Sequence, residues 1–120
     1  VRACWPRWIK RNGKVTSAAF KPRLLSDGRF EGVSVDRTHT RTLDETIKDM
    51  IPRFSLESRF AYVTVLSCRE IGVYIKYVSD TGSKYHSEIY SQAPDIPLTA
   101  EESKKLADAA VLYMSNSESA

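Results

Sequence analysis

Two capping boxes constrain the fold of this 120-residue chain more than any other feature. In each, a threonine is followed three residues later by a glutamate, and the two side chains satisfy free N–H groups of a first helical turn. Apolar residues at helical spacing follow both boxes, so each should begin an amphipathic helix. Pro52 should end the first helix near residue 51, and the inner stripe of the second reaches Met114. The boxes are Thr42 with Glu45 and Thr99 with Glu102.

The segments outside these helices have the composition of strands. Val33 to Asp36 alternates apolar and polar side chains, which is typical of a half-buried strand. Residues 60–66 are dense in aromatic and β-branched residues without clean alternation, which favours a central strand covered on both faces. The segment ending at Lys21 fits a short helix, which we favour, or a short strand. We predict strands at 29–36, 60–66, 73–78 and 84–90, a single helical turn at 67–72 and a hairpin loop at 79–83.

This order of elements predicts an α+β fold, with a mainly antiparallel sheet of about four strands covered by two amphipathic helices. The length is typical of one domain, which we place at 1–116 with a flexible tail at 117–120. Trp5 and Trp8 are costly to leave in water, so the N-terminal segment should dock on the body as an edge strand or arm. A homo-oligomer with these tryptophans or an edge strand at its interface is one hypothesis.

Several functional classes are excluded by missing motifs. The sequence has no G-x-S-x-G, G-x-G-x-x-G or Walker pattern. Its two cysteines, Cys4 and Cys68, lack the spacing of a zinc site and are expected to be reduced thiols. No apolar run reaches the roughly 20 residues of a membrane span, and no signal peptide is recognisable, so we expect a cytoplasmic protein.

The charge is polarised along the sequence. Residues 1–41 contain ten Lys or Arg and three acids, a net charge of +7, which leaves −4 for the remainder of a chain whose total is +3. Such a basic half attracts an anionic partner, either nucleic acid or an acidic protein face. The alternative is that residues 1–41 pair with the acidic remainder of the same chain, so that the opposite charges compensate within the fold. Our leading hypothesis is a non-enzymatic binding or interaction module for an anionic partner.

The stretch from Val33 to Arg41 leads from a strand into a polar loop and a helix start, a common place for a ligand. Arg37 and Arg41 match phosphate oxygens, and Ser34 is a further candidate ligand-binding residue. In the second arm of the hairpin, alternation places His86 and Glu88 on one face.

A metal-dependent phosphodiester or nucleotide hydrolase is the alternative function. An imidazole beside a carboxylate can ligate a divalent metal or act as a general base. The candidate catalytic and metal-binding residues are Asp36, His39, His86 and Glu88, provided that the loop reaches the hairpin. The competing interpretation is that Asp36 pairs with a local arginine, that His39 is a loop residue and that the other two form a solvent-facing polar face.

Three segments in order resemble a group of small bacterial proteins of unassigned function. They are T-S-A-A-F at 16–20, V-S-V-D-R at 33–37 and Y-H-S-E-I at 85–89. The match covers about fifteen residues in the first three-quarters of the chain. The resemblance implies a bacterial domain of unknown activity and assigns no catalytic role. It directs attention to Asp36, Arg37, His86 and Glu88.

Overall fold

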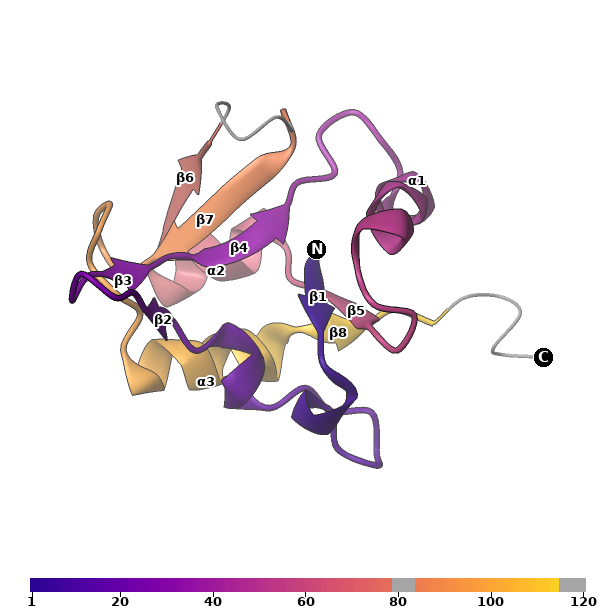
Figure 1. Ribbon diagram of the computed structural model, residues 1–120, viewed down its shortest axis with the longest axis horizontal. Coiled ribbons are helices and arrows are strands. Elements are labelled where there is room, and N and C mark those ends of the chain that lie inside the picture. The colour runs from indigo at the N-terminus through magenta and orange to yellow at the C-terminus, as the bar shows by residue number, and fades with distance from the viewer. Residues whose placement is uncertain (79–83, 115–120) are drawn as a thin grey trace.

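Three α-helices and eight short strands make up the part of the chain that the computed structural model describes, residues 1–78 and 84–114 (Figure 1). The helices are α1 (Leu43–Met50), α2 (Val65–Ile71) and α3 (Ala100–Ala109), with 3₁₀ turns at Pro6–Trp8, Ser17–Phe20 and Ile51–Arg53. The strands are β1 (Arg2–Cys4), β2 (Arg23–Leu24), β3 (Phe30–Glu31), β4 (Val33–Asp36), β5 (Arg59–Tyr62), β6 (Tyr74–Tyr77), β7 (His86–Tyr90) and β8 (Val111–Leu112). The predicted hairpin loop at 79–83 and tail at 117–120 lie outside the described residues.

The strands form two antiparallel three-stranded sheets and a two-stranded ribbon. One sheet has the order β1-β5-β8 and the other β4-β7-β6, while β2 pairs with β3. The α+β class is confirmed. The predicted single sheet of about four strands covered by two helices is replaced, in the described residues, by two three-stranded sheets, a two-stranded ribbon and three α-helices. β5 pairs with the chain ends, β1 and β8, and not with the hairpin β6–β7, so a second sheet forms.

Helix α1 begins and ends as its sequence predicts. Thr42 Oγ1 accepts from the backbone nitrogen of Glu45 at 3.1 Å, and Glu45 Oε1 accepts from the backbone nitrogen of Thr42 at 3.0 Å. The helix tightens into the 3₁₀ turn at Ile51–Arg53, where Pro52 lies. The box at Thr99 and Glu102 starts α3 in the same way.

Two element boundaries differ from the prediction. Strand β5 ends at Tyr62, and Val65 and Leu66 belong to α2, because Thr64 Oγ1 caps the helix by accepting from the backbone nitrogen of Ser67 at 3.0 Å. Helix α2 is therefore longer than the single turn expected at 67–72. Helix α3 stops at Ala109, and Val111 instead enters β8, where the chain pairs with the edge of β5.

The predicted strand at 29–36 is interrupted at Gly32. A Cβ at this position would lie 2.7 Å from Cζ of Tyr90 and 2.8 Å from Cβ of Glu88. The backbone therefore passes against the side chains of β7 at a distance that only glycine permits. The break separates β3, which pairs with β2, from β4, which pairs with β7.

The main core lies between the sheets and helices α2 and α3. Helix α3 packs on the 3₁₀ turn at Ser17–Phe20, where Ser103 Oγ donates to the Phe20 carbonyl at 2.8 Å. Phe20, Ile89 and Leu106 are among the fully buried side chains. A smaller cluster of Ile47, Met50 and Phe60 lies under α1. In Figure 1 the β4-β7-β6 sheet is at upper left, α1 is at upper right and α3 is below.

Candidate functional site

The loop after β4 and the hairpin arm β7 are neighbours, as the sequence hypothesis required. Strand β4 pairs antiparallel with β7, which places Asp36 directly opposite His86 and Ser34 opposite Glu88. Residues that pair in this way extend to the same face of a sheet, and alternate residues along a strand share that face. The side chains of these four predicted site residues therefore share one face.

Asp36 is committed to an ion pair. Its side chain is 5% exposed, and its Oδ2 accepts a short hydrogen bond from Nη2 of Arg53, on the turn after α1. The backbone of Asp36 also exchanges two hydrogen bonds with Val1, at 2.7 and 2.9 Å, which join β4 to β1. Asp36 does pair with an arginine, as the competing interpretation held, but the partner is 17 residues away in the sequence and is not local.

The other predicted ligands have separate surroundings. His39 is exposed in the loop after β4, with a φ of 54°, and its ring lies 6.2 Å from that of Tyr85. Glu88 Oε1 accepts from the Tyr90 hydroxyl at 3.1 Å, and burial together with Glu88 raises the pKa of Tyr90. Within residues 1–78 and 84–114, no three His, Cys, Asp or Glu side chains are grouped so that they could hold a metal ion. The four-residue metal set of the alternative hypothesis is therefore not assembled among the described residues.

Arg41 and Ser34 have roles in tying segments together. Arg41 pairs with Asp49 of α1 at 2.8 Å, donates to the Arg37 carbonyl at 2.7 Å and stacks 3.4 Å from the centroid of Tyr85. Its side chain is only 9% exposed. The Ser34 carbonyl accepts from Nη1 of Arg2 at 2.9 Å. These contacts fix the loop to α1 and β4 to the N-terminal strand.

Arg37 lies on the opposite face from His86. Its Nε donates to Oγ of Ser87 at 2.9 Å, its Nη2 donates to the Lys84 carbonyl, and its guanidinium stacks 4.4 Å from the ring centroid of Tyr77. Ser87 and Tyr77 alternate with the residues on the His86 face. Arg37 therefore extends toward the space between the two sheets.

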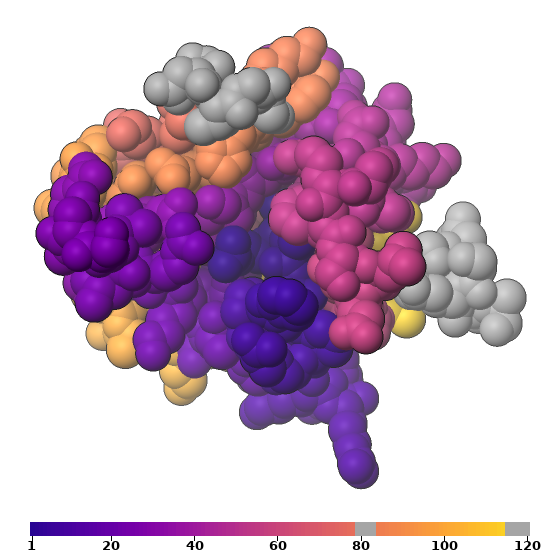
Figure 2. Space-filling view, in the orientation of Figure 1, coloured from indigo at the N-terminus to yellow at the C-terminus, as the bar shows by residue number. Residues whose placement is uncertain are grey.

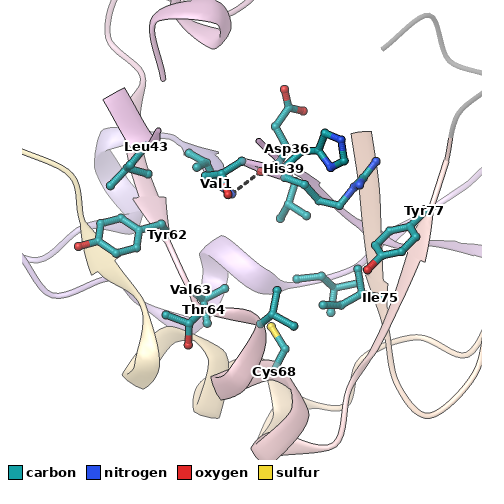
Figure 3. A pocket seen from close by; sticks show the side chains of 15 residues that line it. Val1, Asp36, His39, Leu43, Tyr62, Val63, Thr64, Cys68, Ile75 and Tyr77 are labelled. Carbon is teal, nitrogen blue, oxygen red and sulfur yellow. Dashed lines mark hydrogen bonds between the residues drawn. The ribbon is translucent and has the colours of Figure 1, made fainter. Parts of the chain in front are cut away.

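That space is a cavity of about 580 Å³ (Figure 3). Five consecutive residues of the sequence-predicted stretch, 35–39, line it, and α2, β5 and β6 contribute the remaining walls with Val1, Leu43 and Ile89. Figure 3 shows Cys68, Val63 and Ile75 around the inner part and the Asp36 carboxylate directed away from it. Sequence reasoning pointed to residues 33–41 but missed the apolar walls, which come from segments distant in the chain.

The floor of this cavity is chemically inert. Cys68 is 2% exposed, and burial raises the pKa of its thiol, so that it stays protonated at neutral pH. A protonated, buried thiol is a weak nucleophile. Besides this neutral sulfur, the lining provides carbon surface, the Arg37 guanidinium, the imidazole of His39 and the hydroxyl groups of four residues, Thr38, Tyr62, Thr64 and Tyr77.

A second feature is a basic surface at the N-terminal end, which we call the basic tip: Trp5, Arg7, Lys10, Arg11 and Lys14. Residues 5–14 contain four cations and no acid. The turn is closed by hydrogen bonds from the backbone nitrogen of Lys10 to the Lys14 carbonyl and from that of Gly13 to the Lys10 carbonyl, both 2.9 Å. Figure 2 shows the indigo N-terminal segment at the front of the molecule, reaching its lower margin.

The two tryptophans differ in their environment. Trp8 is half-buried against the main core, with the Arg2 guanidinium 5.7 Å from its ring. Trp5 is 45% exposed, and the Arg7 guanidinium lies 5.2 Å from its ring. The docking expected of the N-terminal segment is confirmed for β1 and Trp8, while Trp5 belongs to the surface.

Comparison with known proteins adds no assignment: no family model matches the chain, and no curated protein or solved structure shows significant similarity to it. The resemblance to small bacterial proteins stays a prediction. In the described part of the chain, no helix combines the length and the apolar character that crossing a membrane requires.

Proposed function

We propose that this protein is a cytoplasmic binding module for an anionic partner, and that the partner is single-stranded nucleic acid held at the basic tip. The observation that carries the proposal is the composition of residues 5–14, with four cations, no carboxylate and an exposed indole. Single strands are bound without sequence preference by cations that follow the backbone and aromatic rings on which bases stack.

Ion pairing inside the molecule supports this location. Lys14 is the one tip residue with a carboxylate within 4 Å among the described residues, Asp108 at 3.2 Å. Both of these side chains are about half exposed, so the pair contributes little and yields readily to a phosphate. Elsewhere in the basic half, Arg23 and Arg29 pair with Glu31 and Asp27. The other three cations of the basic tip, Arg7, Lys10 and Arg11, have no carboxylate within 4 Å among the described residues, so their charge is available to a partner.

Binding to a labelled single-stranded oligonucleotide, followed by fluorescence anisotropy over a salt series, tests the proposal. We expect affinity to fall as salt rises, because phosphate contacts release counterions. The variant Lys10→Ala/Arg11→Ala should reduce the slope of log K against log salt by about 1.4, at roughly 0.7 per lost phosphate contact. The variant Trp5→Ala should weaken binding by about 1–3 kcal/mol through lost stacking.

The matched control is Lys48→Ala/Arg69→Ala, which removes the same charges from exposed positions on α1 and α2. It should leave the salt slope nearly unchanged. Three results would contradict the nucleic-acid proposal. They are absence of binding at low salt, an affinity that does not depend on salt, and an equal reduction of the salt slope in the control variant. Binding of polyglutamate in place of the oligonucleotide would favour an acidic protein partner. Light scattering on the same samples tests the predicted homo-oligomer.

A further inference from the structure

We propose that the cavity between the two sheets binds a small aliphatic carboxylate, whose charged group pairs with Arg37 and whose hydrocarbon chain lies against Val63 and Ile75. The cavity volume of about 580 Å³ falls in the range of small-molecule sites. This inference does not depend on the proposed function, because the residues of the basic tip and those of the cavity lining are different sets.

The Arg37 guanidinium is fixed in position and retains N–H donors that an anion could use. A guanidinium has five N–H donors, of which Arg37 directs one to Ser87 Oγ and one to the Lys84 carbonyl. The others have no acceptor among the described residues, and Arg37 forms no ion pair there. Stacking on Tyr77 restricts the group further, so little conformational entropy would be lost on binding. A carboxylate matches this planar fork.

The charge of the lining favours a single negative charge on the ligand. Arg37 is the only Lys or Arg among the residues that line the cavity within the described chain. Asp36 is neutralised by Arg53, and its carboxylate points away from the cavity (Figure 3). A dianionic phosphate would leave one charge without compensation beside walls of carbon, which is costly. A monoanion is matched.

The valine and isoleucine side chains of the lining favour an apolar ligand body. Val35, Val63 and Ile75 are half-buried and pack at the edge of the main core, so a hydrocarbon chain would cover carbon surface that now faces solvent. Covering this carbon surface is the contribution expected from the hydrocarbon chain of the ligand.

Isothermal titration calorimetry with octanoate, octanol and acetate tests both halves of the site. Octanoate should bind more tightly than octanol, which has the chain without the charge, and than acetate, which has the charge without the chain. Between butanoate and octanoate, affinity should rise with each methylene, by at most about fourfold for one that is fully buried. A series with no dependence on chain length overturns the proposal and needs no variant.

Substitutions locate the ligand. Arg37→Gln should weaken octanoate binding by about tenfold to a hundredfold, as expected for a lost charge-assisted hydrogen bond, while octanol binding changes little. This difference separates anion recognition from a general disturbance of the fold. Val63→Phe should fill the cavity and abolish binding of both. The matched control is Arg69→Gln, an exposed arginine of α2 outside the lining.

The results that overturn the proposal are specific. They are equal affinity for octanoate and octanol, unchanged octanoate affinity in Arg37→Gln, an equal loss in Arg69→Gln, or no heat from octanoate at millimolar concentration. Chemical-shift changes on octanoate addition provide a second readout with ¹⁵N-labelled protein. They should centre on the amides of Arg37 and Ile75, and changes confined to residues outside the lining would likewise contradict the assignment.

Discussion

The carboxylate of Asp36 and the guanidinium of Arg53 form an ion pair that joins β4 of one sheet to the 3₁₀ turn following α1. Asp36 is almost fully enclosed, with 5% of its side chain exposed, whereas Arg53 is 45% exposed. The two residues are therefore unequal partners. Loss of the arginine leaves an enclosed charge, while loss of the carboxylate leaves a cation that water can solvate.

We expect Arg53→Ala to lower the free energy of unfolding by about 1–3 kcal/mol, because it leaves the Asp36 carboxylate without its charged hydrogen-bond donor. Asp36→Asn should cost less, because the amide oxygen still accepts from Arg53 and no charge is left enclosed. Urea unfolding followed by circular dichroism measures both values.

The control is Arg23→Ala, which breaks the exposed pair with Glu31, where Arg23 is 73% exposed. Pairs of this kind contribute about 0–1 kcal/mol, so its effect should be the smallest of the three. The unequal roles assigned to Asp36 and Arg53 would be wrong if Asp36→Asn destabilised the protein as much as Arg53→Ala.

Local signals in the sequence identified most elements, because short-range chemistry determines them. The boxes at Thr42 and Thr99 start α1 and α3, and alternation at 33–36 and 86–90 identified β4 and β7 with the correct faces. The end of α3 was missed because an apolar stripe fits a helix or a strand equally. Val111 enters β8 because the edge of β5 is available, which only the tertiary fold determines.

The candidate site was predictable only in part for the same reason. Residues 35–39 were marked by their polar composition, but their burial partners come from α2 and β6, tens of residues away. Asp36 was a candidate metal ligand because of its residue type, but its carboxylate is paired with Arg53. Nothing local to Cys68 or Val63 shows that they face a cavity.

Gly32→Ala should destabilise the protein by about 1–3 kcal/mol through overpacking, because a new Cβ would lie 2.7 Å from the Tyr90 ring. Tyr90→Ala removes the ring that the new Cβ would contact. The double variant should therefore lose less free energy of unfolding than the sum of the losses in the two single variants. Thermal unfolding of the four proteins measures this coupling.

Gly28→Ala provides the comparison, because Gly28 has a φ of 86° with no atom within 4 Å of an added Cβ. Its cost comes from backbone conformation alone and should be independent of Tyr90. Full additivity of Gly32→Ala with Tyr90→Ala would show that the ring does not set the requirement for glycine.

The thiols of Cys4 and Cys68 should be unreactive in the native protein. Both are buried, at 1% and 2% exposure, and burial raises the pKa of each above the ordinary value of about 9. We expect slow reaction with Ellman's reagent at pH 8 and rapid reaction of both thiols in denaturant. Rapid labelling of the native protein at Cys68 would contradict the buried floor of the cavity.

The same pKa shifts predict how stability depends on pH. As pH rises above about 9, the unfolded thiols lose protons that the native thiols retain, so the free energy of unfolding falls. This contribution is fully present below pH 9. Urea unfolding between pH 8 and pH 10.5 should show a shallower decline in Cys68→Ala than in the parent protein, and equal slopes would contradict the shift.

Thr99→Ala should cost about 1 kcal/mol of stability, because it removes the acceptor for the backbone nitrogen of Glu102 at the start of α3. Thr99→Ser retains the hydroxyl and should be nearly neutral. Ser103 of α3 donates to the Phe20 carbonyl in the core. Loss of the cap should therefore lower the stability of the whole domain and not only cause local fraying of the helix end. Urea unfolding measures the effect, with exposed Lys104→Ala as the control within the same helix. Equal stability of Thr99→Ala and Thr99→Ser would show that the hydroxyl cap does not stabilise α3.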